Sequence, residues 1–146
     1  MPCRAKKPRT PSPDSSYYMK KADEAFMKPY RGLPCEICGK TSIVRNELEY
    51  TTVAHHVIPK SRGRAFRYEP MNVVVLCSVH HMYSNDMAPH SFNAVAVGRW
   101  WAWFATTKPQ QMAWVEANAG KKWGGEWTYK AMYEKLAASH PLDSRD

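Results

Sequence analysis

Two pairs of metal-ligating residues with the same two-residue gap lie about forty positions apart in the sequence. Cys35 and Cys38 form the first pair, and Cys77 and His80 form the second. A pair with this gap, placed on a tight turn or in the first turn of a helix, aims both donors at one ion, as in tetrahedral zinc sites. We therefore predict a structural zinc site of three cysteines and one histidine. The alternative, buried apolar cysteines beside a surface histidine, does not explain why both pairs share the gap.

The sequence contains more histidines near these ligands than one zinc ion needs. His55 and His56 are adjacent, and His81 directly follows His80. Adjacent residues on a helix point in directions about a hundred degrees apart, so His81 should face away from the zinc. If His81 faces His55, the two rings can hold a divalent cation, with Asn85 one helical turn further as a third donor. His56 is then available as a base, because histidine titrates near neutrality.

A basic stretch without acidic residues lies between these histidines. It contains Lys60, Arg62, Arg64 and Arg67. Such a stretch can hold nucleic-acid phosphates in a sequence-independent and salt-dependent way, although a solvated loop has the same composition. A base, a divalent cation and a phosphate clamp are together what hydrolysis of a phosphodiester requires.

Secondary-structure signals predict the order strand, loop, strand, helix for this region. Residues 49–58 and 72–76 are rich in β-branched and aromatic residues and are predicted strands. Ser78 can cap a helix that carries the adjacent histidines and ends before Pro89. His90, beyond this helix, is interpreted as an ordinary surface residue.

The remaining chain is predicted to add an N-terminal arm and a set of helices. Residues 1–16 combine proline, serine and basic residues and are predicted to form a flexible arm. A short lead-in helix and the ligand-bearing region make a core over residues 17–90, and a helical extension over residues 91–146 packs on it. The extension should contain three helices that start near Ser91, Pro109 and Thr128. Its aromatic face, formed by Trp100, Trp103 and Phe104, is interpreted as packing.

The composition is typical of a protein with a polyanionic partner. Lys and Arg number 21 against 13 Asp and Glu, and the formal net charge is +8. No apolar stretch approaches the roughly 20 residues of a membrane-spanning helix. The basic N-terminus also lacks the apolar run of a secretory signal, so we expect no membrane association and a cytoplasmic location. A reducing compartment in turn favours metal binding over disulfides for the cysteines.

The ligand-bearing region resembles the signature of the HNH endonucleases. It reads Cys35-x-x-Cys38, His55-His56-Val-Ile-Pro59-Lys-Ser-Arg-Gly63 and Met71-Asn72-Val-Val-Val-Leu76-Cys77-x-x-His80-His81. The resemblance implies an α+β fold, with a ββα-metal core stapled by zinc. It also implies that His56 is the general base and that Asn72 fixes the loop geometry that orients it. His55 and His81 would bind the catalytic metal.

Two departures from the family pattern affect the expected metals. Many relatives have an acidic residue where His55 stands and a fourth cysteine where His80 stands. Both replacements still donate to a metal, so we expect structural Zn²⁺ and catalytic Mg²⁺ or Mn²⁺, with Ni²⁺ or Zn²⁺ as alternatives because imidazole also suits them. A looser likeness, in residues 21–32 and the helical tail, is to phage recombination nucleases of the NinG type. It implies a bacteriophage origin.

The sequence therefore predicts a metal-dependent endonuclease that hydrolyses DNA. Two alternatives stay open: a non-catalytic zinc-containing DNA-binding module, and an RNA-directed nuclease, because residues that clamp phosphates do not distinguish the sugar. The surplus of histidines favours the enzyme over the binding module. Nothing in the sequence indicates an oligomeric state.

Overall fold

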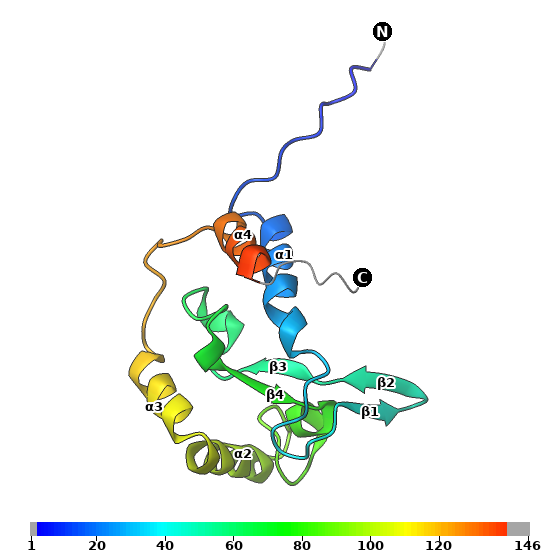
Figure 1. The fold of residues 1–146 in the computed structure, drawn as a ribbon, viewed down its shortest axis with the longest axis vertical. Helices are drawn as coiled ribbons and strands as arrows, with labels where there is room; N and C mark the ends of the chain where they lie inside the picture. Colours follow the sequence, from blue (N-terminus) through cyan, green and yellow to red (C-terminus); the bar gives the residue numbers. More distant parts are fainter. Residues whose placement is uncertain (1–2, 140–146) are drawn as a thin grey trace. The chain divides into compact units, whose positions relative to one another are not determined.

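The chain is seen in a computed structural model that describes residues 3–139 (Figure 1). These residues form an α+β fold, with small antiparallel sheets and helices. Contacts divide the chain into a larger unit over residues 27–124 and a smaller unit formed by the segments on either side of it. The outer ends of the expected arm and helical extension, residues 1–2 and 140–146, lie outside the described part.

The smaller unit pairs the first and last helices of the described chain. These are α1 (Ser16–Met27) and α4 (Tyr129–Ser139). The Lys21 ammonium lies 5.3 Å from the centroid of the Tyr133 ring, and the Thr128 hydroxyl accepts a hydrogen bond from the first turn of α4 at 3.1 Å. The cap at Thr128 was expected from the sequence, whereas the pairing of α4 with α1 was not.

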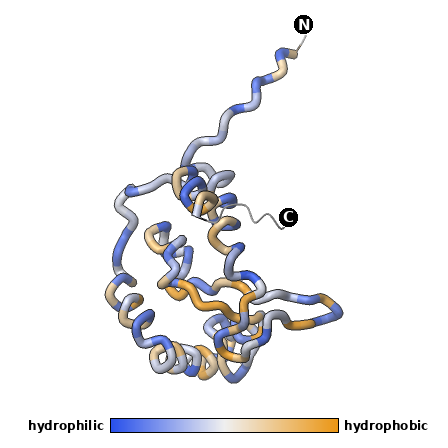
Figure 2. The backbone as a smooth tube through the Cα atoms, in the orientation of Figure 1, coloured by the Kyte–Doolittle hydropathy of each residue, from blue (hydrophilic) through white to orange (hydrophobic). Residues whose placement is uncertain are grey.

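The larger unit is built around the antiparallel strands β3 (Val53–His56) and β4 (Val73–Leu76). His55 lies opposite Val74, and His56 lies opposite Val73. β4 is buried along its whole length and forms a hydrophobic stretch of the backbone (Figure 2). The expected strand over residues 72–76 is confirmed, apart from its first residue.

A β-hairpin that the sequence did not predict precedes this sheet. Strands β1 (Ser42–Arg45) and β2 (Leu48–Thr51) are joined by Asn46 and Glu47, whose φ angles are 51° and 65°. Positive φ at both central residues is the geometry of a tight hairpin turn, which usually contains glycine. The missing glycine explains why the turn is hard to recognise from the sequence.

The expectation of one strand over residues 49–58 is wrong, because the chain breaks at Thr52. This residue is fully buried, and its hydroxyl donates to the carbonyl of Leu33 at 2.5 Å. The break separates β2 from β3 and lets the two strands belong to different sheets.

The helix expected after β4 is shorter than predicted. Only the π-helical segment η4 (Val79–Tyr83) forms. The hydroxyl of Ser84 then accepts hydrogen bonds from the N–H groups of Asp86 and Met87, at 3.1 and 3.0 Å. Serine hydroxyls compete with helical hydrogen bonds in this way, so the chain turns here instead of continuing towards Pro89.

Helices α2 (Ala94–Thr107) and α3 (Pro109–Asn118) complete the core of the larger unit. Asn93 caps α2, in place of the expected Ser91. Trp100 and Phe104 are fully buried and stack with ring centroids 5.2 Å apart, so their interpretation as packing residues is confirmed. Short 3-10 turns occupy Lys28–Tyr30, Lys60–Arg62 and Pro70–Asn72. Among the described residues, no helix is long and apolar enough to span a membrane.

Candidate metal sites

Four residues predicted as zinc ligands lie together in the larger unit. The Sγ atoms of Cys38 and Cys77 are 3.8 Å apart, and Nδ1 of His80 lies 3.3 Å from Sγ of Cys77 and 4.0 Å from Sγ of Cys35. Sulfur ligands about 2.3 Å from a tetrahedral ion would be about 3.8 Å from one another. Cys35, Cys38, Cys77 and His80 are therefore close enough to hold one metal ion.

A tight turn brings the first two cysteines together. The N–H of Gly39 donates to the carbonyl of Cys35 at 2.8 Å, and the N–H of Cys35 donates to the carbonyl of Lys40 at 2.9 Å. Gly39 has a φ of 76°, a left-handed conformation that glycine adopts at little cost. The turn directs both cysteine side chains to the same side.

Glu36 attaches this turn to β4. Its N–H donates to the carbonyl of Val75 at 2.9 Å, and its carboxylate accepts from the N–H of Val75 at 2.7 Å. The same carboxylate forms an ion pair with Lys108. Glu36 thus pairs both main-chain groups of Val75 that β3 leaves unpaired, and it holds Cys35 near Cys77, which directly follows the strand.

The two buried thiols differ in acidity. Burial would raise the pKa of Cys35, but hydrogen bonds from nearby main-chain groups, that of Cys38 foremost, outweigh burial and lower it. Burial, together with the neighbouring Cys35, raises the pKa of Cys77 to about 11. Cys77 would therefore need a cation beside it to ionise near neutrality, which couples ion binding here to proton release.

A second cluster consists of three histidines. The ring centroid of His55 lies 5.1 Å from that of His81 and 4.9 Å from that of His90, and the last two are 4.9 Å apart. One ring nitrogen from each residue lies within 4.8 Å of the others, as a shared ion requires. His80 and His81 thus belong to different clusters although they are adjacent.

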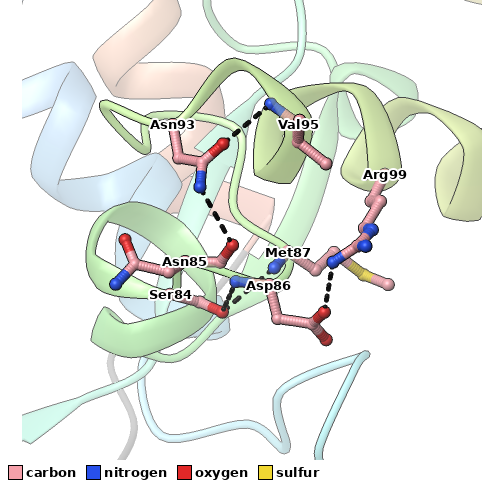
Figure 3. Close-up of polar contacts among 7 residues, drawn as sticks. All are labelled: Ser84, Asn85, Asp86, Met87, Asn93, Val95 and Arg99. Carbon is pink, nitrogen blue, oxygen red and sulfur yellow. Dashed lines mark hydrogen bonds and ion pairs between the residues drawn. The ribbon is translucent and has the colours of Figure 1, made fainter.

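A loop between η4 and α2 positions His90. The N–H of His90 donates to the carbonyl of His81 at 3.1 Å, which brings the loop back onto η4. Figure 3 shows the polar contacts that hold this loop: Asn93 caps α2 at Val95 and donates to the carbonyl of Asn85, and Asp86 pairs with Arg99 at 2.7 Å. The loop is therefore tied to both flanking helices.

His90 is a candidate ligand that sequence reasoning missed, and Asn85 has a different setting from the expected one. η4 ends at Tyr83, so Asn85 is not one helical turn beyond His81 on a common face. Asn85 is exposed, and its side chain points away from Asn93 (Figure 3). The signal that could have revealed His90 is the loop of turn-forming residues after His81, which allows the chain to return.

Burial keeps His55 and His81 neutral. It lowers the pKa of His55 well below 6.5, with smaller contributions from the charges of His81, His90 and His56. Burial and the charge of His90 lower the pKa of His81 to about 4. The ring of Trp100 packs edge-on against His55, with centroids 5.2 Å apart, and forms an apolar wall. Neutral imidazoles have a lone pair to offer, so both rings are ready to bind a cation at pH 7.

The expected base, His56, is buried and has a defined tautomer. Its Nε2 lies 2.7 Å from the carbonyl oxygen of Arg67. A carbonyl oxygen only accepts hydrogen bonds, so Nε2 carries the hydrogen and Nδ1 carries the lone pair of the neutral ring. Neighbouring residues on a strand point to opposite faces, which separates the role of His56 from that of His55.

Asn72 ties down the loop that carries this carbonyl. Its side chain is fully buried. Its Oδ1 accepts from the N–H of Ile58 at 2.7 Å, and its Nδ2 donates to the carbonyls of Ile58 and Phe66, at 3.0 and 3.1 Å. All three bonds fix the backbone between β3 and β4.

The basic residues of this loop have different surroundings. Lys60 and Arg62 are exposed, whereas the guanidinium of Arg64 stacks over Trp123 at 4.2 Å from the ring centroid. Arg62 and Arg67 line a small hollow together with Lys121. Lys121 lies far along the chain from the basic stretch, which is why its place beside it could not be read from the sequence.

Comparison of the chain with protein-family models, with curated proteins and with solved structures found no match. The arrangement of its own residues therefore defines the class: an α+β protein with a cysteine and histidine cluster that can hold a metal ion. It also has a second cluster, of three histidines, one of which is adjacent in sequence to a residue of the first cluster.

Replacing Cys38 by serine should remove a tightly bound metal ion, because one of four donors is lost. Cys3 is also exposed but lies outside the cluster, so Cys3→Ser is the matched control. We expect about one tightly held ion per chain in the control and almost none in Cys38→Ser, measured by mass spectrometry of metals in purified protein. Equal metal contents in the two variants would remove Cys38 from the ligand set.

The low pKa of His81 predicts a loss of stability in acid. Between pH 6.5 and about 4, the unfolded chain binds a proton at His81 that the folded chain does not bind. The free energy of unfolding should therefore fall as the pH falls through this window. Above pH 6.5, His81 is neutral in both states and the free energy of unfolding should no longer depend on its protonation. Urea midpoints should drop less steeply in His81→Gln than in the wild type. Parallel curves would contradict a neutral His81 in the folded chain.

Proposed function

We propose that this chain is a metal-dependent endonuclease of the HNH type that hydrolyses DNA phosphodiester bonds. The observation that carries the proposal is the position of His56: a buried base with a fixed tautomer, next in sequence to a histidine of a cluster suited to a cation. A binding module would need neither the second cluster nor this hydrogen bond.

The cysteine cluster would hold structural zinc. Its distances match those between ligands of a tetrahedral ion, and three sulfurs with one imidazole are a common zinc donor set. It joins the turn after Pro34 to the end of β4. Its role in the proposal is to support the fold.

The histidine cluster would hold the catalytic cation. His55, His81 and His90 supply three imidazoles, a donor set that suits Ni²⁺ or Zn²⁺ better than Mg²⁺, which prefers oxygen ligands. When bound, the cation would stabilise negative charge on the phosphoryl and leaving oxygens. His90, rather than Asn85, completes the candidate ligand set, and we therefore favour Ni²⁺ or Zn²⁺ over the Mg²⁺ or Mn²⁺ expected from the sequence.

His56 would act as the general base. Nδ1 accepts a proton from the attacking water as the water oxygen bonds to phosphorus and the bond to the leaving oxygen breaks. Nε2–H keeps its hydrogen bond to the Arg67 carbonyl, which stabilises the positive charge that develops on the ring. Asn72 is a positioning residue, because it holds the loop that supplies this carbonyl.

The phosphate contacts are proposed to come from the exposed basic residues of the loop. Lys60 and Arg62 are available at the surface, and Lys121 extends the basic surface beside Arg62. The guanidinium of Arg64 stacks on Trp123, so Arg64 also has a role in packing the loop. Since phosphates are common to both nucleic acids, RNA is tested beside DNA in the same assay.

Replacing His90 by alanine should weaken binding of Ni²⁺ to the histidine cluster by at least about 10-fold, because a direct ligand is lost. Asn85→Ala, in the same loop, is the matched control and should bind as the wild type does. Calorimetric titration of zinc-loaded protein measures both. The opposite result, with Asn85→Ala impaired and His90→Ala intact, would restore Asn85 as the third donor.

Replacing His56 by alanine should lower the rate of plasmid nicking by roughly 10²- to 10⁴-fold, the usual contribution of a general base. The assay compares supercoiled DNA with RNA in Ni²⁺, Zn²⁺, Mn²⁺, Mg²⁺ or chelator. Zinc content and circular dichroism establish that the variant folds, and added imidazole should restore part of its activity. Full activity in the folded variant would falsify the role of His56. DNA binding without cleavage in any metal would favour the binding module.

A further inference from the structure

A groove of about 300 Å³ lies between the β1–β2 hairpin and η4, outside the residues assigned above except at His81. Its volume is at the lower end of the range for pockets that bind small molecules. The hairpin side includes Arg45 and Tyr50, and the η4 side includes Met82 and Tyr83. It is therefore a candidate binding site for a compact, flat group.

The groove has aromatic surfaces that face solvent. Tyr50 is 45% exposed and Tyr83 is 52% exposed, and Met82 beside them is 45% exposed. The guanidinium of Arg45 lies 3.6 Å from the centroid of the Tyr83 ring, so the hairpin and η4 touch across the groove. Exposed tyrosine rings and an arginine plane are the groups on which unpaired nucleobases stack.

Strand pairing determines which hairpin residues face the groove. Tyr50 lies opposite Ile43, and Arg45 lies opposite Leu48, so these four side chains share one face of the hairpin. Val44 lies between Ile43 and Arg45, points to the other face and is 71% exposed. The chain thus offers a matched hairpin position outside the groove.

Charge and position favour a nucleic acid as the occupant. No carboxylate lines the groove, and Arg45 gives its wall a positive charge. His81 lines the groove and also belongs to the histidine cluster, so the groove opens directly beside the proposed catalytic ion. A base next to a phosphate bound at that ion would lie near His81 and so near the groove that His81 lines.

We propose that this groove binds one unstacked nucleobase of the substrate strand, next to the phosphate that is cut. The base stacks on the tyrosine rings, and Arg45 contacts its edge or its phosphate. This inference rests on the proposed nuclease function and adds a substrate class: strands in which a base is unpaired or can leave the helix. Stacking of this kind does not select a base sequence.

Binding of oligonucleotides with and without one base tests the groove. Zinc-loaded full-length protein, with no other metal added, is titrated with fluorescent thymidine strands in which a single abasic site is moved along the chain. In the wild type, one position should weaken binding by roughly 5- to 150-fold, the effect of losing one stacked base. Tyr50→Ala should bind the intact strand more weakly and lose this penalty at the same position.

Val44→Ala is the control and should keep both the affinity and the penalty. Arg45→Ala is a second groove variant, used if Tyr50→Ala has a reduced zinc content. The proposal is overturned if no abasic position weakens wild-type binding, or if the groove variants keep the full penalty. Either result would mean that the groove does not bind a nucleobase.

Nicking assays on the same proteins separate this inference from the proposed function. Wild-type nicking without an abasic penalty overturns the groove site alone. An abasic penalty without nicking in any metal supports the groove and overturns the endonuclease. If neither is seen, both proposals are overturned.

Discussion

Hydrogen bonding along both edges of β4 is the constraint on which both candidate metal-binding clusters depend. One edge pairs with β3 and sets the positions of His55 and His56. The other edge bonds to Glu36, which brings the turn of Cys35 and Cys38 to the strand. The strand ends at Leu76, Cys77 follows it directly, and η4 begins at Val79. A main-chain N–H or C=O group that is buried without a hydrogen-bond partner costs free energy, so the groups of this buried strand must be paired. The same requirement therefore fixes the positions of both sets of candidate ligands.

The candidate ligands whose arrangement depends only on neighbouring residues in the chain could be predicted from the sequence. The gap of two residues, repeated in both cysteine-containing pairs, was enough to assign the first cluster, and the adjacent His80 and His81 had to point in different directions. The β-branched run of β4 and the helix start at Pro109 were also readable. In each case the information lies within a few residues of the chain.

The features that could not be predicted depend on contacts that local patterns do not encode. His90 reaches the second cluster through the turn at Ser84 and a main-chain hydrogen bond to His81. The hairpin turn at Asn46 and Glu47 has no glycine to mark it. If the helix continued beyond η4, Asn85 and not His90 would be the third metal donor. The hydrogen bonds of the Ser84 hydroxyl end the helix, and the spacing of apolar residues gives no sign of them.

The cysteine cluster joins residues that lie far apart in the chain, since Cys35 and His80 are separated by 45 positions. An ion bound by both would act on the unfolded chain as a cross-link does. By the loop-closure relation used for disulfides, a link of this length lowers the entropy of the unfolded ensemble and so raises its free energy by roughly 4 kcal/mol at room temperature. Much of the stability of a chain with so small a sheet would then come from restricting its unfolded conformations.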